Sequence, residues 1–253
     1  MRQYVYEDLP GDQLRAHAED ILRSAYSVSL FTTWQHDTIE QVWRKELVEP
    51  AAGNDEASRV TDWSAPPRWH GARLAQVARH PLPGVPATHC TEQLGRPGPW
   101  HTRLPHFRLE FSPSFGDELQ AEYLLPRQHA VEAFDAVGAL RDLLAPVLLI
   151  SEIRTVAADD LWLSPSYQRD CVALHFTWIN DPDAVAPVLG ALEERLAPFA
   201  PRPHWGKLFV APPDVVAASY PRMRDFGRLR RQLDPGGKFG GDLVDRYAPP
   251  VPG

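Results

Sequence analysis

Residues 147–156 read VLLISEIRTV and residues 171–179 read CVALHFTWI. Both stretches are dominated by β-branched, aromatic and other apolar side chains, which favour strands. Residues 128–144 precede the first stretch in the sequence, and residues 184–196 follow the second. Both segments carry apolar residues at the three- and four-residue spacing of an amphipathic helix. We therefore expect two strands of a sheet that is covered by helices.

The same reasoning extends in both directions along the chain. Further strands are expected at residues 25–32, 41–48, 119–125 and 205–210, and further helices at residues 11–23 and 222–232. Between residues 120 and 210 the order is then strand, helix, strand, strand, helix, strand. This order predicts an α+β fold, in which a large, mainly antiparallel sheet is flanked by helices.

The sequence also indicates how the chain is divided. Residues 49–99 are rich in Pro, Gly, Asp and Ala and show little periodicity, which predicts a long irregular excursion. A loop of that length is usually functional or wraps another surface. We therefore expect one domain at residues 1–217 that contains this excursion, followed by a C-terminal helix and tail at residues 218–253.

Composition excludes several classes of protein. The chain has 253 residues, of which 43% are hydrophobic, and this is enough to bury a core. A net charge of -7 argues against nucleic acid as the partner. No apolar run approaches the roughly 20 residues of a membrane span, and the polar N-terminus predicts a cytoplasmic location. Two cysteines exclude a disulfide framework, and we predict no metal site.

Polar pairs interrupt the apolar strands at a regular spacing. Glu152 and Arg154 are two residues apart, so they share one face of the strand with Leu148 and Ile150. Burying such charges costs several kcal/mol unless they are paired or face a wet pocket. The pair is therefore either an internal ion pair or part of a polar site, and the residues alone leave both interpretations open.

Two more strands repeat this pattern. His175 and Thr177 share one face, and so do Gln120 and Glu122. A single histidine in a strand is usually a core residue, but with a threonine two residues later it resembles a hydrogen-bonding wall. If these pairs converge above one sheet, they offer the donors and acceptors that a hydroxyl-rich ligand needs.

Lys207 is the other candidate. It ends the stretch PHWGK at residues 203–207, where a tryptophan and a glycine precede it. A lysine in such surroundings is suited to a position where negative charge develops during a reaction. The alternative is a surface lysine on a turn.

Nine ordered motifs carry a family resemblance. They are AYSVSLFT at 25–32, CTEQ at 90–93, PWH at 99–101 with LPHFR at 104–108, EIRTVAAD at 152–159, HFTW at 175–178, RPHWGK at 202–207, YPR at 220–222 and LDPGGKF at 233–239. Together they resemble the C-terminal part of the sugar-alcohol and aldonolactone oxidases of the vanillyl-alcohol-oxidase superfamily, and most of all the members that oxidise alditols such as xylitol.

The resemblance implies a fold and a reaction. The segment would be the substrate or cap domain that roofs a flavin, with its C-terminal helix and tail packed back on the FAD domain. The cofactor would be FAD, and the terminal hydroxyl of a small polyol would be oxidised to an aldose while O2 is reduced to hydrogen peroxide. The implied catalytic residues are Glu152, Arg154 and Lys207, the last near the flavin, and the implied substrate-binding residues are Gln120, His175 and Thr177.

One expected part of that family is not present in this sequence. The FAD domain should precede residue 4, so we expect the chain to be incomplete alone or to work with a separate FAD-binding domain. Two other interpretations stay open: an aldonolactone oxidase of the D-arabinono-1,4-lactone type, and a non-catalytic module that binds polyols or docks a partner.

Overall fold

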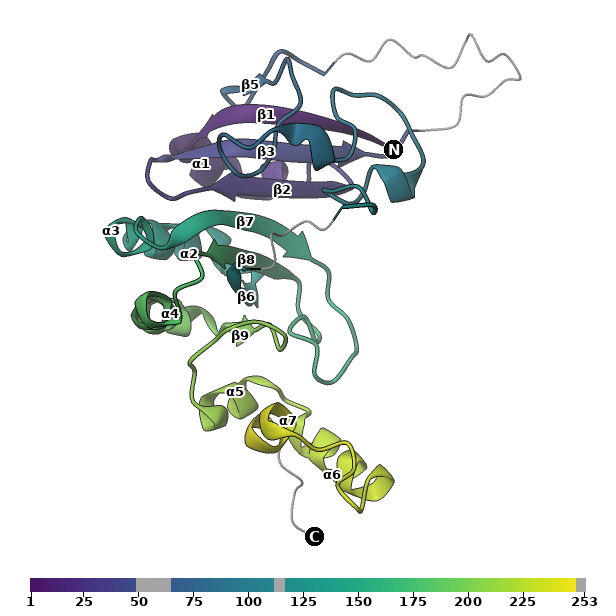
Figure 1. The fold of residues 1–253 in the computed structure, drawn as a ribbon, viewed down its shortest axis with the longest axis vertical. Coiled ribbons are helices and arrows are strands. Elements are labelled where there is room, and N and C mark those ends of the chain that lie inside the picture. The colour runs from purple at the N-terminus through teal and green to yellow at the C-terminus, as the bar shows by residue number, and fades with distance from the viewer. Residues whose placement is uncertain (49–64, 112–116, 249–253) are drawn as a thin grey trace, which may run out of the picture. The chain divides into compact units, whose positions relative to one another are not determined.

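The computed structural model describes residues 1–48, 65–111 and 117–248. These residues form nine strands and seven α-helices (Figure 1). The strands belong to one sheet with the order β4-β5-β1-β3-β2-β7-β8-β6-β9, and the pairs described below are antiparallel. The predicted α+β class with a large, mainly antiparallel sheet is therefore confirmed.

The elements have the following bounds. The strands are β1 (Arg2–Pro10), β2 (Ser27–Thr32), β3 (Thr38–Glu46), β4 (Arg68–Trp69), β5 (Ala72–Leu74), β6 (Leu119–Pro126), β7 (Leu148–Val156), β8 (Cys171–Trp178) and β9 (Arg202–Pro203). The helices are α1 (Gly11–Leu22), α2 (Ala130–Gly138), α3 (Arg141–Leu144), α4 (Pro182–Leu196), α5 (Pro213–Ser219), α6 (Met223–Leu233) and α7 (Asp242–Tyr247).

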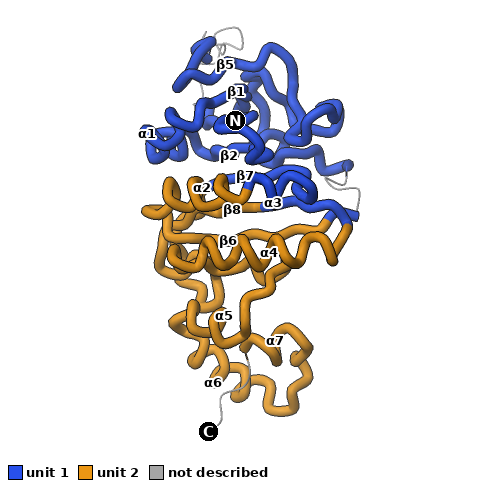
Figure 2. Tube along the Cα trace, turned by 90° about the vertical axis from the view of Figure 1, so that its left-hand side faces the viewer, with its two compact units in different colours: residues 1–118, 141–154, 176–180 blue, residues 119–140, 155–175, 181–253 orange. Residues whose placement is uncertain are grey.

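The chain divides into two compact units, coloured separately in Figure 2. Unit 1 comprises residues 1–118, 141–154 and 176–180, and unit 2 comprises residues 119–140, 155–175 and 181–253. The predicted domain boundary after residue 217 stays a prediction. The predicted excursion is irregular apart from short elements in its described part, and residues 49–64 lie outside the described residues.

Unit 1 is built on adjacent strands with one strongly apolar face. β1 and β2 both pair with β3, and the three lie side by side in Figure 1. The core on this face contains Phe31, Trp43 and Ile150, with Val5 and Cys90 packed against them. Their alternation along the strands follows from the two-residue period of a β-strand.

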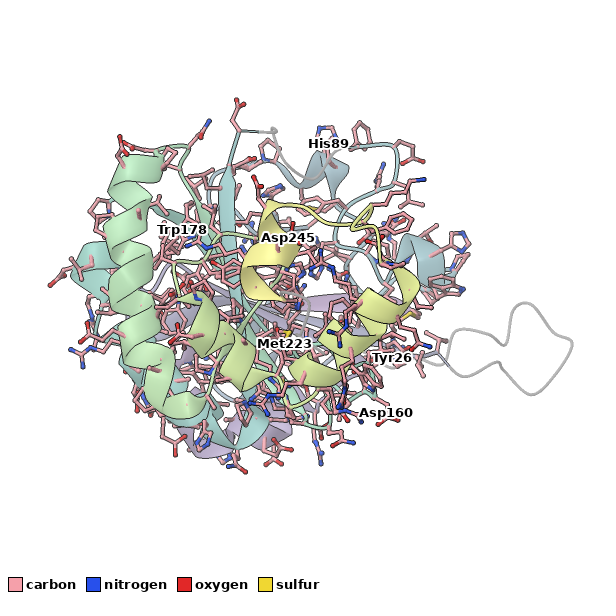
Figure 3. The ribbon with its side chains drawn as sticks, turned by 90° about the horizontal axis from the view of Figure 1, so that it is seen from below. Tyr26, His89, Asp160, Trp178, Met223 and Asp245 are labelled. Atoms are coloured by element: carbon pink, nitrogen blue, oxygen red, sulfur yellow. The ribbon has the colours of Figure 1, made fainter. Side chains whose placement is uncertain are left out.

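Unit 2 combines strand β6 with helices. β6 pairs with β9, and α2 packs against α4. α4 begins where the Asp181 side chain accepts a hydrogen bond from Ala184 N, with a proline at the first helical position. Near the C-terminus, Arg230 of α6 pairs with Asp245 of α7, which is labelled in Figure 3.

Some predicted elements are wrong in detail. Residues 205–210 form no strand, because the chain turns there after β9. The helix expected at 128–144 is broken: α2 ends at Gly138, a residue that favours helix termini. The expected C-terminal tail contains a further helix, α7.

Strand β1 was not anticipated from the sequence. Four consecutive residues, Gln3 to Tyr6, are buried, so both faces of the strand are covered. Such a strand lacks the alternation of polar and apolar residues that makes half-buried strands recognisable.

Candidate functional site

In unit 1, neighbouring strands set Glu152 and Arg154 on the face of the aromatic core. β2 pairs with β7 so that Ser29 lies opposite Arg154 and Phe31 opposite Glu152. β3 places Trp43 opposite Ser29. Directly opposite residues of an antiparallel pair project from the same face. The predicted shared face of Glu152 and Arg154 is therefore the face that buries Phe31 and Trp43.

The Glu152 carboxylate is buried and held at both oxygens. His106 Nε2 lies 2.9 Å from Oε1, and Arg154 Nη1 lies 3.5 Å from Oε2. Burial acts to raise the pKa of Glu152, but the hydrogen bond from His106, the charge of Arg154 and a hydrogen bond from Ser29 outweigh it and lower the pKa. Glu152 is thus an ionised hydrogen-bond acceptor at neutral pH and a poor general base, since a base works best with a pKa near the operating pH.

A buried lysine contacts the other nitrogen of the His106 ring. Lys45 on β3 is fully buried, and its Nζ donates to His106 Nδ1 at 3.0 Å. Burial lowers the pKa of His106, so the ring is neutral at neutral pH and carries its proton on Nε2, facing Glu152. Burial also lowers the pKa of Lys45 to about 7, against which the negative charge of Glu152 acts.

In unit 2, Lys207 ends a tight turn beside β6. The backbone pairs with β6 on both sides of this turn, through His204 N to Glu122 O (2.9 Å) and Leu208 N to Gln120 O (2.8 Å). Between these bonds, Lys207 N donates to His204 O at 3.1 Å. The turn replaces the predicted strand, and it fixes the backbone of Lys207 close to β6.

The Lys207 ammonium joins a carboxylate and an imidazole. Its Nζ donates to Glu122 Oε2 at 2.5 Å and to His175 Nδ1 at 2.8 Å. Glu122 is only 3% exposed. An ammonium has three N–H donors, so one donor of Lys207 has no partner within the described ranges. Its side chain is 16% exposed, so protein does not enclose it completely.

The predicted residues thus fall into two groups. Glu152 contacts Arg154 in unit 1, and His175 contacts Lys207 in unit 2. Thr177 follows on β8, and Gln120 on β6 uses its backbone carbonyl to hold the segment after Lys207. That all six residues surround one ligand stays a prediction.

Four further residues complete the two groups. Glu122 shares the predicted strand face with Gln120, so alternation pointed to it. Ser29 lies on β2, Lys45 lies on β3, and His106 lies in the LPHFR motif. Sequence reasoning missed Ser29, Lys45 and His106, because only the fold brings residues 29, 45, 106 and 152 together.

The described residues contain neither a cluster of metal ligands nor a membrane-spanning helix. Residues 1–48, 65–111 and 117–248 contain no group of three or more His, Cys, Asp or Glu side chains placed to hold a metal ion. In the same ranges, no helix combines the length and apolarity needed to cross a bilayer.

Comparison with known proteins identifies relatives. The alditol oxidase of Streptomyces sp. (strain IKD472 / FERM P-14339) is 52% identical over 237 residues, which is 94% of this chain and 53% of the relative. The L-gulono-1,4-lactone dehydrogenase of Mycobacterium tuberculosis (strain ATCC 25618 / H37Rv) is 31% identical over 134 residues, or 52% of this chain and 31% of that protein. The L-gulonolactone oxidase of Mus musculus is 27% identical over 143 residues, or 54% and 32%.

Each match covers a larger share of this chain than of the relative. The chain spans about half the length of the Streptomyces relative and about a third of the two lactone-acting enzymes. A family profile, D-arabinono-1,4-lactone oxidase, matches residues 117–247. The predicted resemblance to sugar-alcohol and aldonolactone oxidases is therefore confirmed, and the chain belongs to the D-arabinono-1,4-lactone oxidase family.

Proposed function

We propose that the chain is the substrate-binding half of an FAD-dependent alditol oxidase that converts the terminal hydroxyl of a polyol to an aldehyde and reduces O2 to hydrogen peroxide. The observation that carries the proposal is the Lys207 ammonium, held by Glu122 and His175 with one donor left over. The 52% identity to an alditol oxidase over 94% of this chain supports it.

Lys207 and Arg154 supply positive charge where the reaction needs it. When a carbinol is oxidised, negative charge develops on its oxygen as the O–H proton leaves. A fixed cation stabilises that charge in a partly desolvated site without having to reorganise. The Arg154 side chain is 38% exposed, so its guanidinium reaches a ligand as well.

Glu152 suits recognition of the remaining hydroxyls. A hydroxyl needs both an acceptor for its proton and a donor for its lone pairs. Glu152 Oε2 and Arg154 Nη1 are 3.5 Å apart and offer one of each. His175, Thr177 and Gln120 would hold the rest of the polyol chain, and fixing the substrate in this way lowers the entropic part of the barrier.

The residues of this chain fit one side of a flavin site. Both candidate cations retain exposed surface, and the partnerless donor of Lys207 suits an oxygen or nitrogen acceptor. The family's flavin, when bound, accepts the hydride and later delivers the electrons to O2. Lys207 would lie beside it, and the rest of the cofactor would be held by an FAD-binding domain.

The first test is the visible absorption spectrum of the purified chain before and after addition of FAD and xylitol. A flavin band that bleaches with xylitol supports an oxidase site assembled by this chain itself. If the chain does not retain FAD, it is joined to the flavin half of the Streptomyces alditol oxidase, and hydrogen peroxide production from xylitol is measured.

Variants of that joined protein test the roles. Arg154→Ala and Lys207→Met are expected to abolish turnover. Arg23→Met is the control, because Arg23 is 64% exposed in an ion pair on the surface of α1. Near-normal turnover in both site variants would overturn the assignment of Arg154 and Lys207.

Aldonolactone oxidation is the second candidate, favoured by the family profile and by the gulonolactone enzymes at 27% and 31% identity. It uses the same chemistry on a ring hydroxyl. Faster turnover of a lactone than of any alditol by the joined protein would select it. Polyol binding without oxygen consumption would instead select the non-catalytic module.

A further inference from the structure

Among the described residues of unit 1, Lys45 is the most deeply buried cation, and each of its three donors has one acceptor. Its Nζ donates to Leu104 O at 2.5 Å, to Pro105 O at 3.0 Å and to His106 Nδ1 at 3.0 Å. Three acceptors satisfy the three donors of an ammonium. A lysine without a remaining donor and without exposed surface cannot act on a ligand, so its effect passes through His106.

The contact with Lys45 decides which nitrogen of His106 carries the proton. As an ammonium, Lys45 only donates, so Nδ1 must accept, and the neutral ring then has its proton on Nε2. That proton points at Glu152 Oε1, 2.9 Å away. The ring also packs edge-on against Phe31 and Trp43, at centroid distances of 5.5 and 5.2 Å, so its plane is fixed.

The backbone around His106 is fixed as well. Thr91 Oγ1 donates to Pro105 O at 2.6 Å, and Thr91 N donates to His106 O at 2.9 Å. An isolated bridge between Cys90 and Phe107 extends this pairing. Two irregular segments thereby hold the imidazole at one place over the sheet, which gives the CTEQ and LPHFR motifs a structural role.

We propose that Lys45 and His106 are positioning residues, which commit Glu152 Oε1 to His106 so that Oε2 is presented together with Arg154 to one substrate hydroxyl. This inference rests on the proposed function. Without the His106 bond, the carboxylate keeps only the contacts with Ser29 and Arg154, and its last side-chain torsion is a soft one. Both of its oxygens then compete for Arg154, and the acceptor for the hydroxyl is no longer fixed.

The first experiment uses the whole chain, labelled with 15N, and records long-range 1H–15N NMR spectra of its imidazoles. The His106 signals are assigned by their loss in His106→Gln. The wild type is expected to show a neutral ring protonated on Nε2, and Glu152→Gln is expected to shift that signal while leaving His89 unmoved. Protonation on Nδ1, or no shift in Glu152→Gln, would overturn the inference.

The second experiment compares two amide variants of His106 in the joined flavoprotein, and the amide of each variant takes the place of one ring nitrogen. The amide of His106→Gln replaces Nε2 and keeps a donor for Glu152, whereas the shorter His106→Asn replaces only Nδ1. His106→Asn is expected to raise KM for xylitol about tenfold, with a smaller change in kcat, and His106→Gln is expected to restore most of that loss.

The outcomes separate the two proposals. Equal loss in both His106 variants, accompanied by a lower unfolding midpoint, would mean a merely structural role, and wild-type KM in His106→Asn would overturn the inference directly. If the wild-type joined protein oxidises neither polyol nor lactone, the proposed function fails, and the NMR spectra still decide whether Lys45 and His106 fix Glu152.

Discussion

Each unit contains a lysine, a histidine and a glutamate in contact, yet the lysines differ in role. In unit 1, Lys45 donates to His106, which in turn donates to Glu152. In unit 2, Lys207 lies in the middle and donates to both His175 and Glu122. In both groups a lysine contacts the histidine through Nδ1.

The difference lies in how many donors each lysine has left. Lys45 has three acceptors and no exposed surface, whereas Lys207 has two acceptors in the described part of the chain and a partly exposed side chain. We propose that the first lysine organises a carboxylate and that the second retains a donor for chemistry. On this proposal, the number of satisfied donors distinguishes the two lysines, whereas their residue type does not.

The largest expected effect comes from the lysine with the remaining donor. Lys207→Met in the joined flavoprotein should lower kcat by at least about 100-fold, the usual cost of losing one group that stabilises developing charge. His175→Asn, which keeps an acceptor for Lys207 near Nδ1, should lower it less than about tenfold. Steady-state oxygen consumption with xylitol measures both, and equal losses would break the distinction between an acting and a supporting residue.

The next effect is on stability and concerns the carboxylate of unit 2. Glu122→Ala removes one of two acceptors of a largely buried ammonium and should cost about 3 kcal/mol of unfolding free energy, since breaking a buried pair leaves an uncompensated charge. Urea unfolding followed by tryptophan fluorescence measures this. Glu92→Ala is the control, because Glu92 forms a surface pair with Arg96 and should change stability by less than about 1 kcal/mol. A loss no larger than that of the control would contradict the buried pair.

Sequence patterns predicted the parts of both groups that lie on regular strands. Glu152, Arg154 and His175 are recognisable because a polar residue in an alternating apolar strand stands out. His106 is not, since it lies in an irregular segment with no period, and its partner Lys45 is 61 residues away in the sequence. The turn before Lys207 escaped prediction for a related reason: its bonds to β6 are non-local, and the local residues favour a strand equally well.

The third effect depends on pH and concerns the carboxylate of unit 1. A Glu whose pKa is lowered in the folded protein adds stability above its ordinary pKa of 4.5, and this stability is lost as the pH falls below that value. The wild type should therefore lose about 1 to 3 kcal/mol more than Glu152→Gln between pH 5 and pH 3. Unfolding midpoints in urea across this range measure the difference. Parallel pH profiles for the two proteins would mean that Glu152 is not held as an ion.

The smallest stability effect is expected at Arg154, where function and stability should separate. Its contact with Glu152 is 3.5 Å long and its side chain is 38% exposed, so solvent screens the pair and Arg154→Ala should change the unfolding free energy by less than about 1 kcal/mol. The same change is expected to abolish turnover, because a guanidinium near the surface of the site is there for the ligand rather than for the fold. Arg154→Lys should keep the stability and recover only part of the turnover, since a lysine offers charge without the planar pair of donors. If Arg154→Ala instead destabilises the protein as much as Glu122→Ala does, then Arg154 belongs to an internal ion pair, which is the simpler of the two interpretations that strand alternation leaves open.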